Sequence, residues 1–179
     1  SAFVPAPASL TNANFQSAVN LWFDDEANAT ATYGHIKDWN VTGVTNMQNA
    51  FKDRATFNED ISGWDVSNVT HINDMFSGAS TFNQPIGDWN VSSVRNMGGM
   101  FRDAASFNQP IGGWNTSKVT NMAYLFRDTP FNQPIGDWNV SSVTSMRYMF
   151  VETPFNQPIG DWNVSSVNNM EFMFWKASS

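Results

Sequence analysis

The sequence contains no cysteine, and this absence excludes a disulfide framework and a thiolate metal site. Charged residues are also few: they make up 14% of the 179 residues, with nine Lys and Arg against 16 Asp and Glu. Nucleic-acid binding requires a basic stripe, so neither nucleic acid nor an anionic membrane surface is an expected partner of this acidic chain. The sequence has no run of 18 apolar residues, and no segment is expected to span a membrane.

Histidine is equally scarce. The only two, His35 and His71, occupy different places in the sequence pattern described below. No nucleophile and base are arranged as acid–base or covalent catalysis would need. We therefore predict that the protein is not an enzyme.

What the sequence has in abundance is repetition. Six tryptophans follow one another at intervals of 25, 25, 25, 24 and 24 residues; they are Trp39, Trp64, Trp89, Trp114, Trp138 and Trp162. The segment Phe-Asn-Gln-Pro-Ile-Gly-Asp-Trp-Asn-Val-Ser-Ser-Val, which begins at Phe82, recurs almost letter for letter from Phe131 and from Phe155. Such self-similarity at a fixed period is typical of stacked repeats.

Each repeat has two halves with different periodicity. In the second half the apolar residues follow a helical spacing, as in Val94, Met97 and Phe101, and a Ser or Thr stands two residues before the Val, where a helix N-cap belongs. The first half, Phe-Asn-Gln-Pro-Ile-Gly-Asp-Trp, indicates an extended segment with a very short strand. The sequence therefore predicts an α/β solenoid, a right-handed stack of six turns of 24–25 residues, each with one short parallel strand and one short helix.

Three segments are predicted along the chain. Residues 1–9 are a flexible lead-in, and residues 10–32 form an N-terminal helical cap because Phe15 and Trp22 belong to an apolar helical stripe. Residues 33–179 form the six-turn stack. Its last turn has no cap, so we expect a repeat array truncated at its C-terminus, end-to-end self-association through that turn, or Trp175 folding back over it as a minimal lid.

The repeat pattern resembles the BspA-like leucine-rich-repeat surface proteins, whose members include 25-residue repeats of mycoplasma-type surface lipoproteins. The resemblance covers residues 33–179 through the motif Phe-Asn-Gln-Pro-Ile-Gly-Asp-Trp-Asn-Val-Ser-Ser-Val-x-x-Met-x-x-Met-Phe. It implies a leucine-rich-repeat-like fold, a secreted or cell-surface location, and adhesion or binding of a protein or glycan. It offers no catalytic residues.

Oxygen-bearing side chains beside the tryptophans are the candidates for a metal site. They are Asp88, Asn90, Asp137, Asn139, Asp161 and Asn163. A stacked row of such oxygens suits Ca²⁺, but Gly63 and Gly113 interrupt the Asp row, and Asn at this place also suits an Asx turn. We therefore expect no required metal or other cofactor. Among the Asn-x-Ser/Thr sequons, Asn28 is the glycosylation candidate because it lies outside the crowded stack.

These observations predict an extracellular or cell-surface repeat module that binds a protein or glycan. One alternative is a structural, self-associating element of a surface layer, fibre or filament. Another is a calcium-, ice- or mineral-binding solenoid, although Arg95 and Asn168 interrupt the row of threonines that a regular ice-binding face would need.

Overall fold

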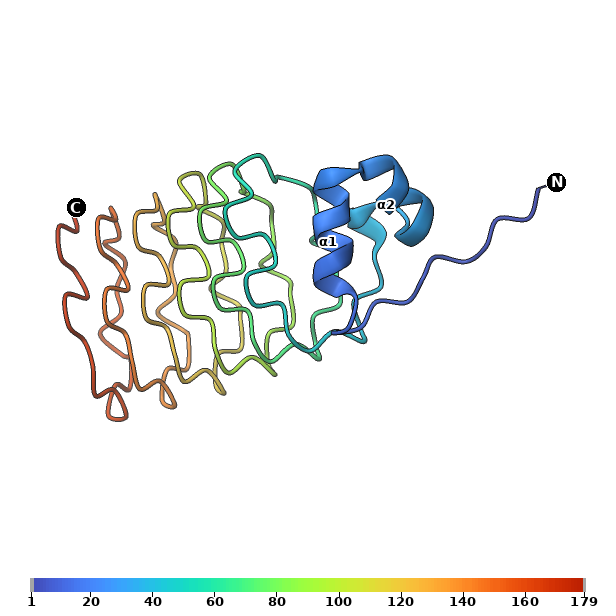
Figure 1. The fold of residues 1–179 in the computed structure, drawn as a ribbon. Helices are drawn as coiled ribbons and strands as arrows, with labels where there is room; N and C mark the ends of the chain where they lie inside the picture. The colour runs from blue at the N-terminus through green and yellow to red at the C-terminus, as the bar shows by residue number, and fades with distance from the viewer. Residues whose placement is uncertain (1, 179) are drawn as a thin grey trace.

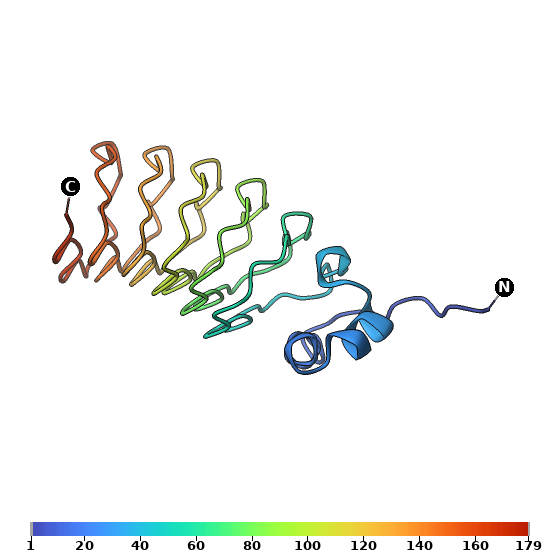
Figure 2. The ribbon, with the colours of Figure 1, turned by 90° about the horizontal axis from the view of Figure 1, so that it is seen from above.

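The computed structural model describes residues 2–178 as a helical N-terminal segment followed by a row of coils (Figures 1 and 2). The helices are α1 (Phe15–Asp24), α2 (Glu26–Tyr33) and the short 3₁₀ helix η1 (Ile36–Asp38). We number the coils as repeats 1 to 6, residues 33–56, 57–81, 82–106, 107–130, 131–154 and 155–178. Helices α1 and α2 lie at one end of the row, and the C-terminus lies at the other (Figure 1).

The predicted α/β class is wrong. Between Tyr33 and residue 178 the chain contains no α-helix and no strand of a sheet. Neighbouring repeats are joined by isolated parallel bridges, such as those of Asn96 with His71 and with Asn121. The repeats therefore do not each contain a strand and a helix, as leucine-rich repeats do. The tandem repetition itself is present.

The hydrogen bonds in the second half of each repeat explain why no helix forms there. Every second amide donates to the next repeat; the N–H of Gly99, for example, donates to the carbonyl of Ala123 at 2.8 Å. The amides that alternate with them donate to the carbonyl three residues earlier in the same repeat, as Met100 does to Met97 at 3.1 Å. An α-helix needs successive amides to bond four residues back within one segment, so bonding between repeats excludes it.

A left-handed backbone at two positions per repeat, four residues apart, accompanies this pattern. The pairs are Asn49 and Asp53, Asp74 and Gly78, Gly99 and Asp103, Tyr124 and Asp128, Tyr148 and Glu152, and Phe172 and Lys176. Gly, Asn and Asp adopt this conformation with the least strain. The sequence therefore carried a signal against the helix, since Gly98 and Gly99 stand in the middle of the segment expected to be helical.

The first half of each repeat is joined to its neighbour by side chains. The Oδ1 of Asn83 accepts the backbone N–H of Asn108 and the Nε2 of Gln109, both at 3.0 Å. The indole N–H of Trp114 donates to the carbonyl of Ile86 at 3.0 Å. Equivalent bonds link the other repeats, so an amide and indole ladder takes the place of the expected strand. Because side chains make these bonds, Trp recurs in all six repeats, Asn in repeats 2 to 6 and Gln in repeats 3 to 6.

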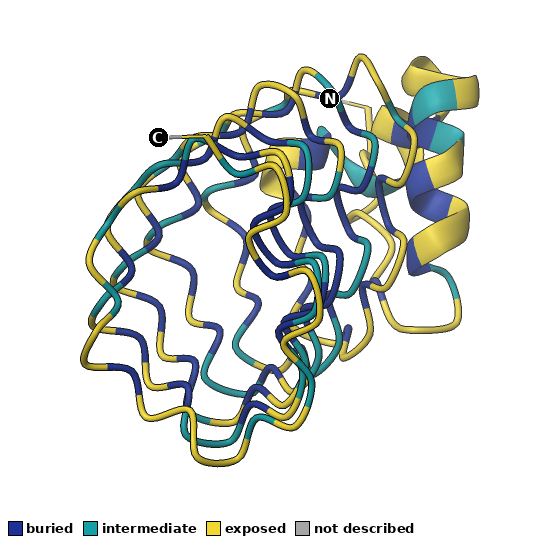
Figure 3. Cartoon of the chain, turned by 90° about the vertical axis from the view of Figure 1, so that its left-hand side faces the viewer, coloured by how far each residue is buried: buried dark blue, intermediate teal, exposed yellow. Residues whose placement is uncertain are grey.

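The interior contains the apolar residues that the repeat pattern assigned to it. Trp114 is 3% exposed, and Phe101 and Phe107 are fully buried, with ring centroids 3.8 Å apart. Phe107 also stacks on Phe131 of the next repeat at 6.2 Å. Figure 3, which looks along the row from its C-terminal end, shows buried and exposed residues alternating around each coil. The predicted inward positions are confirmed for repeats 1 to 5.

At the N-terminal end of the row, the helical segment takes the place of a preceding repeat. The Oδ1 of Asn12 accepts the N–H of Thr45 at 2.9 Å and that of Asn46 at 3.2 Å. In later repeats the equivalent amides bond to a backbone carbonyl of the repeat before. Helix α1 buries Phe15 and Trp22 at this end, so the first repeat is covered both by apolar packing and by matched hydrogen bonds.

The C-terminal end carries a row of free amide donors. In repeat 6 the amides of Met170, Phe172, Phe174 and Lys176 occupy the positions that would donate to a next repeat, and residues 2–178 provide no acceptor for them. The carbonyls of the residues between them already accept bonds from repeat 5. The side chains of Phe172, Phe174 and Trp175 are about half exposed, at 50%, 49% and 48%. This face is therefore apolar, and its unpaired groups on this segment all donate.

Candidate binding site on the variable face

The two halves of the repeat differ in how freely their side chains vary. In the second half the backbone makes the bonds between repeats, so side chains there are free to differ. One such position holds Gln48, Asn73, Gly98, Ala123, Arg147 and Glu171 in repeats 1 to 6, and the next, left-handed position holds Asn49, Asp74, Gly99, Tyr124, Tyr148 and Phe172. We call the surface formed by these two positions the variable face.

The variable face is hollowed over repeat 3, where both of its positions are glycine. Gly98 and Gly99 contribute no side chain, whereas Asp74 and Tyr124 flank them from repeats 2 and 4. The hollow measures about 530 Å³, which lies in the usual range for small-ligand sites. It is lined by Asn73, Asp74, Asn96, Gly98, Gly99, Arg102, Asn121, Ala123, Tyr124, Thr144, Ser145 and Arg147.

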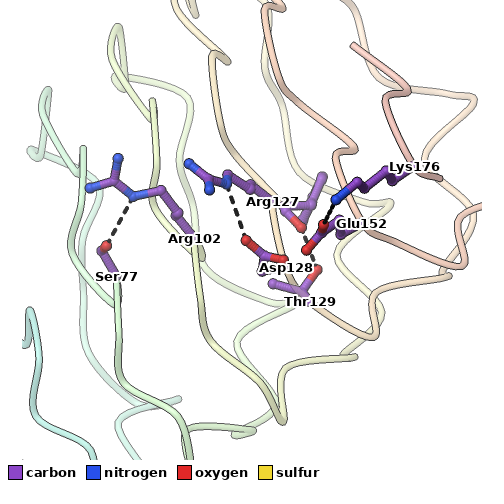
Figure 4. Close-up of polar contacts among 8 residues, drawn as sticks. Ser77, Arg102, Arg127, Asp128, Thr129, Glu152 and Lys176 are labelled. Atoms are coloured by element: carbon purple, nitrogen blue, oxygen red, sulfur yellow. Dashed lines mark hydrogen bonds and ion pairs between the residues drawn. The ribbon is translucent and has the colours of Figure 1, made fainter. Parts of the chain in front are cut away.

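Two guanidinium groups lie beside the ring of Tyr124. The Nη2 of Arg147 donates to the Tyr124 hydroxyl at 3.0 Å, and the guanidinium carbons of Arg147 and Arg102 lie 5.4 and 5.7 Å from the ring centroid. Arg102 also reaches to repeat 2, where its Nη2 is 3.7 Å from Asp74 Oδ1. Its Nε is 3.5 Å from Ser77 Oγ in the same repeat (Figure 4). With two Arg and one Asp, the hollow is locally cationic in a chain of net charge −7.

Two cations outside the hollow, one in repeat 4 and one in repeat 6, are already paired with carboxylates. Arg127 lies 3.1 Å from Asp128, and Lys176 lies 3.3 Å from Glu152 (Figure 4). These pairs are partly exposed and contribute at most about 1 kcal/mol each. Arg147 forms no ion pair with any carboxylate of residues 2–178, so its charge is available to a ligand.

Two buried polar atoms of the hollow also lack a hydrogen-bond partner in the described part of the chain, the Nε of Arg147 and the Oδ1 of Asn73. An unmade buried hydrogen bond costs about 1–3 kcal/mol, and both atoms are covered by the side chains around them, so a ligand in the hollow does not reach them in this conformation. Tyr124 and Tyr148 add strain, because bulky residues at φ 60° and 55° cost about 1–2 kcal/mol each. Unsatisfied buried groups concentrate at functional sites, whereas the left-handed backbone recurs in every repeat and belongs to the architecture.

The oxygen-bearing residues beside the tryptophans do not form a compact cluster. Asp137 and Asp161 line one shallow hollow on the opposite half of the repeat, and Asp88 lies outside it. No set of three His, Cys, Asp or Glu suited to a metal ion occurs within residues 2–178. The sequence predicts that the protein does not require calcium, and this stays a prediction.

The asparagines of the same candidate set form turns. The Oδ1 of Asn90 accepts the backbone N–H of Ser92 at 3.1 Å and its hydroxyl at 2.6 Å. The equivalent backbone bond is present at Asn139 and Asn163, with distances of 3.0 and 3.1 Å. The serine was expected to cap a helix, but no helix follows, so the N-cap interpretation is wrong and the Asx-turn interpretation holds.

The glycosylation candidate Asn28 lies on α2, not in a loop. Its side chain is exposed, and its Oδ1 accepts the hydroxyl of Thr32 at 3.3 Å. Its backbone N–H is capped by Asp25 at 3.0 Å. Modification at this position stays a prediction.

Comparison with known families identifies the chain. A family model described as "Mycoplasma protein of unknown function, DUF285" matches residues 17–130 and 111–179. The chain belongs to this family. Membership in DUF285 agrees with a tandem-repeat protein of mycoplasma type, while the closer relation to BspA-like proteins stays a prediction. Comparisons with curated proteins and with solved structures gave no match. None of the helices described within residues 2–178 is long and apolar enough to cross a bilayer.

Proposed function

We propose that this protein is a secreted or cell-surface repeat module, akin to the BspA-like proteins, that binds a protein or glycan through its variable face and is not an enzyme. The observation that carries the proposal is the hollow over Gly98 and Gly99. It combines a tyrosine ring with a guanidinium, that of Arg147, which has no carboxylate partner among residues 2–178. Tyr and Arg are the residue types that dominate the energetics of recognition surfaces.

The chemistry of the hollow suits recognition. Its one carboxylate, Asp74, lies opposite Arg102, and the other polar lining groups are the Arg147 guanidinium, amides, hydroxyls and Tyr124. A general base needs a hydrogen-bonded nucleophile or substrate proton within reach, and no such pair is formed among these residues. The same groups are well suited to hold a polar ligand by several hydrogen bonds.

The test is a screen with a purified chain on a glycan array and a panel of defined extracellular-matrix proteins. The triple variant Arg102→Ala, Tyr124→Ala, Arg147→Ala should lose the binding that the wild type shows. Lys118→Ala removes an exposed positive charge outside the hollow and should keep it. Binding that survives the triple variant would show that the variable face is not the recognition surface.

A structural, self-associating element is the second candidate, and the C-terminal face favours it. Phe172, Phe174 and Trp175 are about half exposed there. Because the free backbone groups of Met170, Phe172 and Phe174 are N–H donors and the carbonyls beside them are already bonded, two copies of this segment cannot form a backbone ladder with each other. Contact between two such segments would therefore depend on these apolar side chains.

Light scattering over a range of concentrations tests this second candidate. Self-association predicts a mass that rises with concentration, and the double variant Phe174→Ser, Trp175→Ser should keep the protein monomeric. A wild type that stays monomeric throughout removes the support for this candidate and leaves the binding module.

A further inference from the structure

The C-terminal edge of repeat 6 offers only hydrogen-bond donors along its backbone. In repeats 1 to 5 the corresponding amides donate to the next repeat, as the N–H of Tyr148 does to the carbonyl of Glu171 at 2.9 Å. In repeat 6 the N–H groups of Met170, Phe172 and Phe174 have no acceptor among residues 2–178, and every backbone carbonyl of residues 169–175 already accepts a backbone N–H. A partner that continues the ladder must therefore supply carbonyls at alternate residues.

An ordinary extended segment is a poor partner for such an edge. Each residue of an extended strand turns its N–H and its C=O toward the same neighbour. The N–H groups of the incoming segment would therefore face the N–H groups of repeat 6 and stay unpaired, which weakens binding. Proline keeps its carbonyl but has no N–H. A segment with proline at alternate positions therefore offers acceptors without opposing donors.

The lead-in of this chain has that pattern in its described part, residues 2–9. Pro5 and Pro7 stand two residues apart, so the side of the segment that they share with Phe3 carries three carbonyls and a single N–H. A residue that precedes proline is held in the extended region, which applies here to Val4 and Ala6. Because the segment is already extended, docking it costs little conformational entropy.

The lead-in is accessible, but it lies far from the C-terminal edge of its own copy. The side chains of Phe3 and Val4 are 89% and 83% exposed. Residues 2–6 make no backbone hydrogen bond to another part of the described chain. Figures 1 and 2 show the lead-in leaving the helical end of the row, with repeat 6 at the opposite end. The lead-in that meets this edge must therefore come from a second copy.

We propose that the C-terminal edge of one copy binds the lead-in of a second copy. The carbonyls on the proline side of the lead-in accept the free N–H groups of repeat 6, and Phe3 and Val4 pack against the half-exposed Phe174 and Trp175. The contact joins two different surfaces, so the assembly grows head to tail into open chains. This inference goes beyond ligand binding by the variable face, and it gives self-association a specific pair of surfaces.

Sedimentation equilibrium of the whole chain tests the role of the prolines. The double variant Pro5→Ala, Pro7→Ala adds two N–H groups that face the donors of repeat 6, so the association constant should fall at least about tenfold. Its melting temperature should be unchanged, because both prolines are exposed. Pro85→Ala is the matched control, since it removes an exposed proline ring in repeat 3 and should leave association unchanged.

Mixing two variants tests whether the contact is head to tail. The double proline variant keeps an intact edge, and the double variant Phe174→Ser, Trp175→Ser keeps an intact lead-in. We expect neither variant to associate alone, whereas an equimolar mixture should form a dimer and nothing larger. In the mixture the ¹⁵N-labelled proline variant should show shifted amide signals for Met170, Phe172 and Phe174.

A synthetic peptide with the sequence of residues 2–9 makes the test independent of the serine variant. It should shift the same three amide signals of the proline variant. A peptide in which alanine replaces both prolines should bind at least about tenfold more weakly.

Three results would overturn the proposal. They are a wild type that stays monomeric at every concentration, an association constant that the proline variant does not change, and a mixture no heavier than its separate components. The second result would leave apolar contact between two C-terminal edges as the mode of association. Ligand binding by the variable face is tested separately by its own triple variant, so either inference can fail without the other.

Discussion

Truncating a central tryptophan tests whether the side-chain ladder of the first half holds the repeats together. Trp114 is 3% exposed, its indole N–H donates to Ile86 at 3.0 Å, and its ring stacks on Trp138 at 6.3 Å. Trp114→Ala removes all of these contacts and leaves a cavity. Truncation of a buried aromatic residue costs about 3–5 kcal/mol, a large share of the 5–15 kcal/mol typical of a whole domain.

Two further variants separate the contributions. Trp114→Phe keeps most of the apolar packing but leaves the carbonyl of Ile86 without its donor, which should cost about 1–3 kcal/mol. Trp175→Ala is the matched control, because Trp175 is 48% exposed and its ring contacts Phe172 at 6.2 Å and the Lys176 ammonium at 4.4 Å. Its truncation should cost less than about 1 kcal/mol.

Guanidinium chloride unfolding, followed by near-ultraviolet circular dichroism, measures these free energies. The variants can be compared when the slope of the unfolding free energy against denaturant concentration is the same in all of them. We expect midpoints to fall in the order wild type, Trp175→Ala, Trp114→Phe, Trp114→Ala. Equal losses for Trp114→Ala and Trp175→Ala, or a Trp114→Phe variant as stable as the wild type, would refute the role assigned to the ladder.

Two other predictions concern the turns and the amide ladder. Asn108→Ala removes the acceptor of the Asn132 N–H (3.0 Å) and should lower the free energy of unfolding by about 1–3 kcal/mol in the same assay. Asn168 is exposed, so Asn168→Ala should be nearly neutral. Equal losses of stability in the two variants would contradict the role of the amide ladder. Hydrogen bonds from the side chain and backbone of Ser67 hold the pKa of Asp65 below its ordinary value. This stabilisation is present above about pH 4 and is lost as the pH falls through the lowered pKa. The melting temperature of Asp65→Asn should therefore fall less between pH 7 and pH 2 than that of the wild type. An equal fall in both proteins would contradict the role assigned to Asp65.

The sequence by itself determined the period of the repeats, their number and the residues that face inward. These follow from letters that recur at 24 or 25 residues, because like positions must stack and an apolar letter at the same place in every turn must be covered by its neighbours. The ladder of the first half was visible in the same way, as Trp in all six repeats, Asn in repeats 2 to 6 and Gln in repeats 3 to 6, although the bonding role of these side chains was not.

The conformation of the second half was decided only by the tertiary structure. The spacing of Val94, Met97 and Phe101 suits one face of a helix, but an amide can bond either within its own segment or to the next repeat. That choice depends on a neighbour 24 or 25 residues away, which a local pattern does not describe. The glycines at 98 and 99 and the asparagine and aspartates at left-handed positions were the local signs of the second option.

The candidate site was likewise invisible in the sequence. Asp74, Gly99, Tyr124 and Arg147 belong to four different repeats, and along the chain they are single variable letters in an otherwise regular pattern. Stacking sets them side by side, so that two missing side chains in one repeat become a hollow between the side chains of its neighbours. The physical reason is that a row of parallel coils turns equal positions in successive repeats into adjacent positions on one surface.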